Sequence, residues 1–423
     1  MRKKMSEIVD IIDGDRGTNY PKQDDFSENG FCLFLNTGNV RKEGFSFETN
    51  VFITKEKDSA LRKGKLQRDD IVYTTRGTVG NVGYYSSKVR YEHIRINSGM
   101  VIFRAIDTNV SMSFLYHLLR SKDVRKEFLS YCTGSAQPQL PIKILKEIKV
   151  DIPDIEIQQR IVSILSSYDD LIENNQKQIK LLEEAAQRLY KEWFVDLRFP
   201  GYEDVEIVDG VPKGWSKKFF KDFVDYEIGG GWGEDYADRE HTILATVIRG
   251  TDFDDIKKGA FRGLPVRYHK ESNFNARKLE YGDIIFEVSG GSRTTGVAKS
   301  LLMNKNILKK MSNMVICASF CKLIRVTNPM YSQYIYDVLQ YSRIVGITEQ
   351  FEKKSASSII NYNWKDFLQQ FEVYLPTFDI LEKYNQIAKK LYTEQMLCCI
   401  RISELQEARD RLLPKLMSGE VEV

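Results

Sequence analysis

The feature that most constrains this chain is an internal duplication. At a shift of 223 residues, a stretch near the end of each half matches the other without a gap. Identical pairs include Pro153 with Pro376, Ile164 with Ile387, Ile179 with Ile402, Leu182 with Leu405 and Leu189 with Leu412. A repeat this long indicates a duplicated domain rather than the short unit of a solenoid.

A second segment repeats at a shift of 213, where residues 66–83 match residues 279–296. Asp70 matches Asp283, and Gly83 matches Gly296. The two shifts together indicate two tandem copies of a unit that mixes strands and helices. A protein with two similar halves is suited to a partner that also has two similar halves.

Length and composition narrow the class of protein. A chain of 423 residues exceeds one ordinary core, so we expect at least two domains. Its apolar runs are too short for a membrane span, and the N-terminus does not continue into the apolar core of a signal peptide. The six cysteines show neither disulfide-framework nor zinc spacing. We therefore expect a reduced, cytoplasmic protein that does not bind membranes.

The charge of the chain excludes a generally basic coat for nucleic acid, because the formal net charge is only +3. Any binding to DNA must rest on local patches. One such patch is residues 41–90, which hold eleven Lys or Arg against six Asp or Glu. Charge runs of this kind are also common on ordinary solvated faces.

The first predicted domain covers residues 1–153. Short apolar or β-branched runs bounded by Gly, Asn or Asp predict strands at 31–36, 70–75, 100–106 and 148–153. Helical spacing predicts one helix over 113–132, followed by a turn-rich loop at 133–142.

A long helix is predicted over 154–195, where apolar side chains recur at alternating steps of four and three. At 1.5 Å per residue, this helix would be roughly 55 Å long. Asn175 interrupts the apolar seam, as a buried polar residue does when it fixes register or partner. The seam residues expected at the helix or partner interface are Ile157, Ile161, Ile164, Leu171, Ile179, Leu182, Leu189 and Trp193.

The second copy follows an acidic, aperiodic linker at 196–212. It comprises a domain at 213–376, a helix at 377–413 that Pro414 is expected to end, and a tail at 414–423. The second seam contains Ile380, Ile387, Leu391, Ile402, Leu405 and Leu412. Both seams become buried if the helices pair, and the intervening domain makes them antiparallel. The expected fold class is α+β: two similar mixed domains separated by two long antiparallel coiled-coil helices, with pseudo-twofold symmetry.

The sequence lacks familiar catalytic motifs. It has no phosphate-cradling GxxxxGK[ST] and no HExxH, and its four histidines lack ligand spacing. Glu352, Lys353 and Lys354 match the end of a nuclease carboxylate–lysine motif, but no convincing upstream carboxylate accompanies them. We expect neither a catalytic site nor a metal site.

Several segments carry a family resemblance. DDIVYTTRGTVGNVGYY, TGSAQPQLPI, IQQRIVSILSSYDDLIENNQKQI and the final LLPKLMSGEVEV occur in this order in a duplicated chain. Together they make the sequence similar to the specificity (S) subunit of type I restriction–modification systems, over essentially its whole length.

The resemblance implies two target-recognition domains, each reading one half of a split, asymmetric site in double-stranded DNA. The antiparallel helices would set the spacing of the half-sites and dock methyltransferase (modification) subunits, two per chain. Restriction/translocase subunits would complete the complex. The chain itself would be non-catalytic and hold no cofactor, because S-adenosylmethionine, ATP and Mg²⁺ would be bound by the partner subunits.

Two turn-rich loops are the candidate DNA contacts in the first copy. Arg and Asn can pair bidentately with guanine and adenine, and Thr can reach phosphate or a thymine methyl group. The first loop supplies Thr75, Arg76, Thr78 and Asn81, and the second supplies Ser135, Gln137 and Gln139. A hairpin turn with a solvated arginine and a purely structural loop remain the alternatives.

The second copy has corresponding candidates, although its loop sequences differ. These residues are Ser292, Arg293, Thr294, Lys353, Lys354 and Ser355. Lys63, Lys65, Arg277 and Lys278 precede the repeated strands and are candidates for phosphate contacts, which add affinity without sequence choice.

Two alternatives from other classes remain open. A coiled-coil adaptor with two protein-binding domains would explain the duplication and the helices, but not the basic residues beside the turns. A nuclease would require metal-dependent cleavage by the isolated chain. The aromatic cluster Tyr190, Trp193 and Phe194 either caps the helix pair or belongs to a partner interface.

Overall fold

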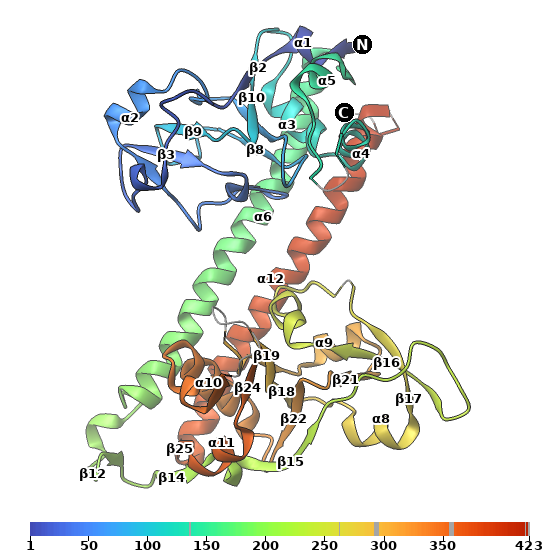
Figure 1. Cartoon of the computed structure of the whole chain (residues 1–423). Helices are drawn as coiled ribbons and strands as arrows, with labels where there is room; N and C mark the ends of the chain where they lie inside the picture. The colour runs from blue at the N-terminus through green and yellow to red at the C-terminus, as the bar shows by residue number, and fades with distance from the viewer. Residues whose placement is uncertain (135–136, 262, 292–295, 355–358, 419, 422–423) are drawn as a thin grey trace. The chain divides into compact units, whose positions relative to one another are not determined.

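The computed structural model describes residues 1–134, 137–261, 263–291, 296–354, 359–418 and 420–421. The chain divides into two compact units (Figure 1). The first unit comprises Met1–Leu171 and Leu405–Val423, and the second comprises Ile172–Glu404. Each unit therefore contains a globular domain and a part of both long helices.

Two main sheets form the domain of the first unit, beside a short pair of β4 Val40–Arg41 with β5 Gly44–Phe45. An antiparallel sheet has the order β2-β10-β7-β8, and a second sheet has the order β6-β3-β9, in which β3 and β9 are parallel. The strands are β2 Val9–Asp13, β10 Met100–Ala105, β7 Ile71–Thr74, β8 Val82–Tyr84, β6 Phe52–Ile53, β3 Cys32–Leu35 and β9 Ile94–Ile96. Apolar side chains of both sheets, including Leu35, Val72 and Ile102, share one core cluster.

The second unit repeats this topology. Its antiparallel sheet has the order β15-β22-β18-β20, and its three-stranded sheet has the order β17-β16-β21, with β16 and β21 parallel. The strands are β15 Val224–Gly229, β22 Cys321–Val326, β18 Ile284–Glu287, β20 Ser300–Leu302, β17 Val266–Lys270, β16 His241–Ile248 and β21 Val315–Cys317. The predicted duplication is thus present in strand order and strand direction.

A short antiparallel pair closes each copy at its chain ends. In the first unit, β1 Arg2–Lys4 pairs with β11 Lys149–Asp151, and in the second unit β14 Ser216–Phe219 pairs with β25 Glu372–Leu375. The second unit also has a sheet in the order β19-β24-β23, from β19 Ser289–Gly291, β24 Ile360–Tyr362 and β23 Glu352–Lys354.

A buried ion pair explains why the repeated motif contains an aspartate. Asp70 accepts two hydrogen bonds from the Arg104 guanidinium, at 3.0 and 2.7 Å, and one from the backbone amide of Gln67 at 2.7 Å. Asp283 accepts the matching bonds from Arg325, both at 2.8 Å, and from the Glu280 amide at 2.7 Å. Each carboxylate closes the turn before a central strand and ties it to the neighbouring strand.

Shorter helices cover the sheets and contribute to the cores. The first unit has α1 Met5–Ile8, α2 Lys55–Ala60, α3 Met112–Arg120, α4 Lys122–Ser130 and α5 Ile142–Glu147. The second has α7 Phe253–Lys257, α8 Glu271–Arg277, α9 Lys305–Lys310, α10 Tyr331–Ile344 and α11 Trp364–Gln370. The single helix predicted over 113–132 is therefore wrong. It is two helices because Ser121 adopts an extended conformation, and its hydroxyl caps α4 by accepting a bond from the Val124 amide.

Two long helices, α6 Ile155–Tyr190 and α12 Phe378–Ser418, contribute to both units (Figure 1). Within the second unit, successive α6 residues meet progressively earlier α12 residues. Cys398 lies 3.4 Å from the Gln178 amide oxygen, Gln395 donates to Glu183 at 2.9 Å, and the Tyr384 ring lies 5.9 Å from the Trp193 ring. In this unit the two helices are therefore antiparallel, as predicted.

The predicted seam is partly wrong. Ile161 and Trp193 are buried as expected, but Ile157 and Leu171 are 39% and 50% exposed, and Ile172 is buried instead. The helical repeat of 3.6 residues explains this shift, because a straight helix rotates away from a strict seven-residue pattern. Ile387 on α12 is also exposed.

Pro414 does not end the second long helix, which continues to Ser418. Proline lacks the amide hydrogen for one helical bond, but the side chains on either side of it are anchored. Leu413 and Leu416 are buried in the core of the first unit. Burial of these two leucines holds the final turn in place, so the predicted boundary at residue 413 is corrected.

The aromatic cluster at the end of α6 belongs to the core of the second unit. Tyr190, Trp193 and Phe194 are buried, and the Phe194 ring lies 4.7 Å from the rings of both Tyr334 and Tyr384. Trp193 packs against Tyr384 of α12, so of the two alternatives the structure agrees with a cluster that caps the helix pair. These large rings supply the apolar contacts that attach the helix ends to the domain.

Candidate nucleic-acid interface

The first candidate loop is a tight turn after β7. The Thr74 hydroxyl donates to the Thr78 carbonyl at 2.5 Å, and Gly77 and Gly80 have φ of +70° and +89°. Such backbone angles favour glycine, which explains the spacing of the glycines in this motif. Arg76 and Thr78 are exposed at the tip of the turn.

The structure brings the second candidate loop against this turn. The Leu140 amide donates to the Thr75 carbonyl at 3.0 Å, and Arg76 and Gln139 form an isolated antiparallel bridge. Gln137 and Gln139 are exposed. Two loops more than fifty residues apart in the chain thus present polar side chains beside one another. Ser135 lies outside the described residues.

Thr75 and Asn81 do not belong to the exposed part of this loop. The Thr75 hydroxyl donates to the Gly99 carbonyl at 3.1 Å, and the Asn81 amide nitrogen donates to the Val40 carbonyl at 2.9 Å. Asn81 also accepts a bond from Arg125 at 3.1 Å. Both side chains are buried, so their interpretation as base contacts is corrected. They hold the turn against its neighbours.

Two neighbours of the turn, Thr37 and Arg16, were not predicted from the sequence. The Gly99 carbonyl accepts bonds from the amides of Thr75 and Arg76, and a Cβ at Gly99 would meet the Thr37 side chain at 2.8 Å. Arg16 donates to the Ser98 carbonyl at 3.3 Å. The first recognition surface is therefore defined as Arg16, Thr37, Arg76, Thr78, Gln137 and Gln139. The signal for Arg16 was its place in a glycine-flanked turn directly after a strand.

The two candidate lysines of the first unit differ. Lys63 is exposed, whereas Lys65 makes a 2.5 Å ion pair with the buried Asp58, which also binds Arg95 at 2.6 Å. Burial alone would raise the pKa of the Asp58 carboxyl, but its bonds to Lys65 and Arg95 lower that pKa by more. The pKa of Asp58 is therefore below its usual value. Lys65 therefore stabilises the fold, and Lys63 is the freer of the two to meet a phosphate.

The second unit joins the corresponding segments through the same backbone bond. The Tyr362 amide donates to the Val288 carbonyl at 2.8 Å, at the positions that Leu140 and Thr75 hold in the first unit. The Ser289 hydroxyl contacts the Asn361 amide oxygen at 2.7 Å, and Lys353 pairs with Asn361 across β23 and β24.

Different side chains occupy the tip of this second platform. Where Gly99 accepts two amide bonds in the first unit, Phe320 accepts bonds from Val288 and Ser289, at 2.9 and 3.3 Å. The Phe320 ring is 61% exposed. The second recognition surface is defined as Ser289, Phe320, Lys353 and Asn361. Ser292, Arg293, Thr294 and Ser355 lie outside the described residues, as does the side chain of Lys354.

Comparisons with known proteins find relatives over most of the chain. The model of the type I restriction modification DNA specificity domain matches residues 1–184. The chain is 26% identical to the MjaIX specificity subunit of Methanocaldococcus jannaschii, over 89% of this chain and 82% of that protein. It is 22% identical to the HindI specificity subunit of Haemophilus influenzae, over 99% of this chain and 100% of that protein.

Residues 1–184 thus match a type I restriction modification DNA specificity domain, and the chain is similar over most of its length to type I specificity subunits. Its fold is also found in a solved structure. The crystal structure of the S subunit from M. genitalium aligns over 98% of this chain and 95% of that one, with a TM-score of 0.60 and 15% identity.

In the second unit, Arg277 and Lys278 are half-buried at the end of α8. The Arg277 guanidinium donates to the Gly229 carbonyl at 2.9 Å, and the Lys278 carbonyl lies 3.5 Å from the Arg325 guanidinium. Arg277 thus supports the glycine-rich segment after β15. That segment carries Trp232, over whose ring the Arg267 guanidinium lies at 4.8 Å. Trp232 is partly exposed and was not among the predicted contacts.

The turns of the two units also differ beneath their tips. Thr74 of the first unit corresponds to Glu287, which is buried against Gly250 and has one carboxylate oxygen without a hydrogen bond. Burial raises the pKa of Glu287. The first turn is therefore closed by a hydroxyl, and the second contains a desolvated carboxyl.

The described residues offer no metal centre, since no three His, Cys, Asp or Glu side chains gather in them. All six cysteines are free, and Cys317 and Cys321 are buried. Within the ranges that the structure describes, no helix has both the length and the apolar character needed to cross a membrane.

Proposed function

We propose that this chain is the non-catalytic subunit that selects the DNA target of a type I restriction–modification complex. The first recognition surface reads one half of a bipartite, asymmetric site, and the second reads the other half. One observation carries the proposal: each unit joins two distant loops by the same backbone bond, but presents different side chains at the tip.

The chemistry of the two tips supports different half-sites. Arg76 can donate two bonds to a guanine edge, and Gln137 and Gln139 can pair with adenine. The second surface instead offers Lys353, Asn361 and the exposed ring of Phe320, which suits stacking or contact with a thymine methyl group. Similar platforms with different tips are what two unequal half-sites require.

The long helices supply the rest of the proposed role. They set the spacing of the half-sites and dock two modification subunits, and restriction/translocase subunits join the complex. Exposed Ile157 and Leu181 on α6 and Ile387 on α12 support this, because each leaves apolar surface for a partner. S-adenosylmethionine, ATP and Mg²⁺ are assigned to the partner subunits.

The test is the pattern of adenine methylation in a host without methylation of its own. The chain is co-expressed with its modification subunit, and modified adenines are mapped across the genome. A split, asymmetric motif that disappears when this chain is omitted supports the proposal. A stable complex that methylates nothing and binds DNA no more tightly than the modification subunit alone supports the adaptor alternative instead.

A further inference from the structure

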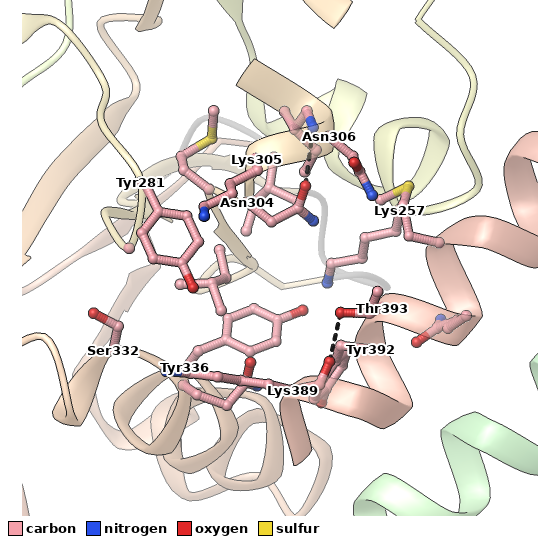
Figure 2. A pocket seen from close by; sticks show the side chains of 18 of the residues that line it. Lys257, Tyr281, Asn304, Lys305, Asn306, Ser332, Tyr336, Lys389, Tyr392 and Thr393 are labelled. Atoms are coloured by element: carbon pink, nitrogen blue, oxygen red, sulfur yellow. Dashed lines mark hydrogen bonds between the residues drawn. The ribbon is translucent and has the colours of Figure 1, made fainter. Parts of the chain in front are cut away.

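The second unit contains a cavity of about 370 Å³ that the recognition surfaces do not use (Figure 2). Its wall is formed by the segment from β20 into α9, by one face of α10 and by α12. The volume lies within the range of small-molecule pockets, which are mostly apolar with a few convergent polar groups. None of the four residues of the second recognition surface lines it.

Three lysines from three separate elements line this cavity. Lys257 is the last residue of α7, Lys305 is the first of α9, and Lys389 lies on α12. Among the described residues, no Asp or Glu lines the cavity with them. Asp254 and Glu183 act on Lys257 from beyond the wall, but the described residues of the wall itself carry only the positive charges, so its surface favours an anion.

Lys257 is the most constrained of the three. Its Nζ atom donates to Gln340 at 3.2 Å, lies 5.7 Å from the Tyr336 ring centre, and points into the cavity in Figure 2. Burial lowers the pKa of Lys257 to about 8. An incoming anion would replace part of the hydration that this ammonium group has lost.

Aromatic rings form much of the remaining wall. Tyr281 is exposed at one side with the Lys305 ammonium 5.6 Å from its ring centre, and Tyr336 and Tyr392 lie near the base. The Tyr392 hydroxyl donates to Asp337 at 2.7 Å. That bond fixes the ring, so Tyr392 meets a ligand with its aromatic surface and not with a free hydroxyl.

Asp337, a buried acid on α10, is occupied by other side chains. Asp337 also accepts bonds from Tyr384 at 2.7 Å and from Gln333 at 3.1 Å, and it does not line the wall. A ligand therefore meets ammonium groups and aromatic surface together, without a facing carboxylate.

We propose that this cavity binds a free mononucleotide, with its phosphate between the lysines and its planar base against the tyrosines and the apolar wall. The proposal does not rest on DNA recognition, because the residues of the two sites are separate. Inorganic phosphate lacks the ring and a nucleoside lacks the charge, so each should bind more weakly than the nucleotide that combines them.

The test is calorimetric titration of the full-length chain with adenosine 5′-monophosphate, adenosine and inorganic phosphate. We expect the nucleotide to bind with a Kd below about 1 mM, and the other two to bind about tenfold more weakly. Failure of the nucleotide to bind at millimolar concentration would overturn the proposal, as would phosphate binding equally well.

Neighbouring lysines provide matched controls. Lys257→Met, Lys305→Met and Lys389→Met should each weaken nucleotide binding about tenfold. Lys258→Met, Lys309→Met and Lys390→Met remove the same charge from the same or an adjoining segment outside the cavity wall, and should leave binding unchanged. Circular dichroism verifies that each variant is folded. Equal effects of the lining and control variants would assign the binding to general surface charge and refute the site.

A nucleotide-like group could also come from the end of a DNA strand. A short single-stranded oligonucleotide with a 5′-phosphate separates the two sources by competition. We expect it to displace the mononucleotide poorly, because the cavity has room for one nucleotide. Displacement at equal molar concentration would mean that the site holds a strand end, and would contradict a site for the free ligand.

Discussion

The two units share their buried scaffold and differ at their exposed tips. Asp70 with Arg104 in the first unit repeats as Asp283 with Arg325 in the second, with nearly the same hydrogen-bond lengths. At the tip, however, Gly99 of the first unit corresponds to the exposed Phe320. Duplication has therefore preserved the carboxylate–arginine pair at the base of the loops and changed what the loops present.

The strongest test of whether the two scaffolds are equivalent is to remove the repeated carboxylate from each unit. Asp70→Ala and Asp283→Ala each leave an arginine without its buried partner, so we expect each to destabilise its own unit by about 3 kcal/mol. Denaturation followed by hydrogen exchange in each unit measures this. Asp24→Ala and Asp225→Ala, at exposed positions, should change stability by less than about 0.5 kcal/mol. A large effect in one unit and a small one in the other would mean that the scaffold is not equivalent.

The units should respond oppositely to acid. Burial lowers the pKa of His117 in the first unit to about 4 and raises the pKa of Asp337 in the second to about 6. Between pH 4 and 6.5, His117 binds more protons in the unfolded protein than in the folded one. The free energy of unfolding of the first unit therefore falls by about 3 kcal/mol as pH falls through that window. Folded Asp337 binds more protons between pH 3.8 and 6, so its contribution to the second unit rises by a similar amount as pH falls.

The pH dependence of hydrogen exchange in each unit measures this difference. His117→Gln should flatten the slope of the first unit without changing the second, and Asp337→Asn should do the reverse. Identical slopes in wild type and both variants would show that other groups dominate the acid response.

Within the first turn, a substitution at the exposed tip should affect DNA binding, and a substitution at the buried base should affect stability. Arg76 is exposed, so Arg76→Ala should weaken binding of the cognate site by about 2 kcal/mol and leave stability unchanged. Asn81 is buried with two partners, so Asn81→Ala should lower stability by about 1–2 kcal/mol. Titration of DNA at fixed salt, together with thermal denaturation, tests both expectations. Unchanged affinity of Arg76→Ala would remove it from the surface.

The smallest expected effect concerns the two neighbouring lysines. Lys63→Ala should reduce the slope of log K against log salt by about 1, with equal loss on specific and non-specific DNA. Lys65→Ala should act mainly on stability, because it removes an ion pair from Asp58. A salt series for both variants distinguishes a phosphate contact from a structural charge.

Much of the scaffold could be predicted because it follows local rules. Alternating short apolar runs located β3, β7 and β10, and a sustained helical period located α6. The details that failed depend on tertiary packing. Leu171 is exposed because a straight helix drifts from the seven-residue seam, and Pro414 stays helical because buried Leu413 and Leu416 anchor the turn.

Only part of the candidate interface could be predicted from the sequence. Glycine spacing identified the turn around Arg76, but could not distinguish the exposed arginine from the buried Asn81 in the same turn. Arg16, Thr37 and Phe320 were missed because strand pairing, and not sequence proximity, places them at the tip. The sequence left two alternatives open for Trp193, because its buried environment comes from distant residues such as Tyr384.

The central claim is that two equivalent platforms read two different half-sites. The most direct test maps methylated adenines in a methylation-free host for wild type, Arg76→Ala and Lys353→Ala, each co-expressed with the modification subunit. The account predicts that Arg76→Ala relaxes the sequence of one half of the motif, and that Lys353→Ala relaxes the other half, with the spacing unchanged. Relaxation of the same half by both variants, or an unchanged motif in both, would contradict it.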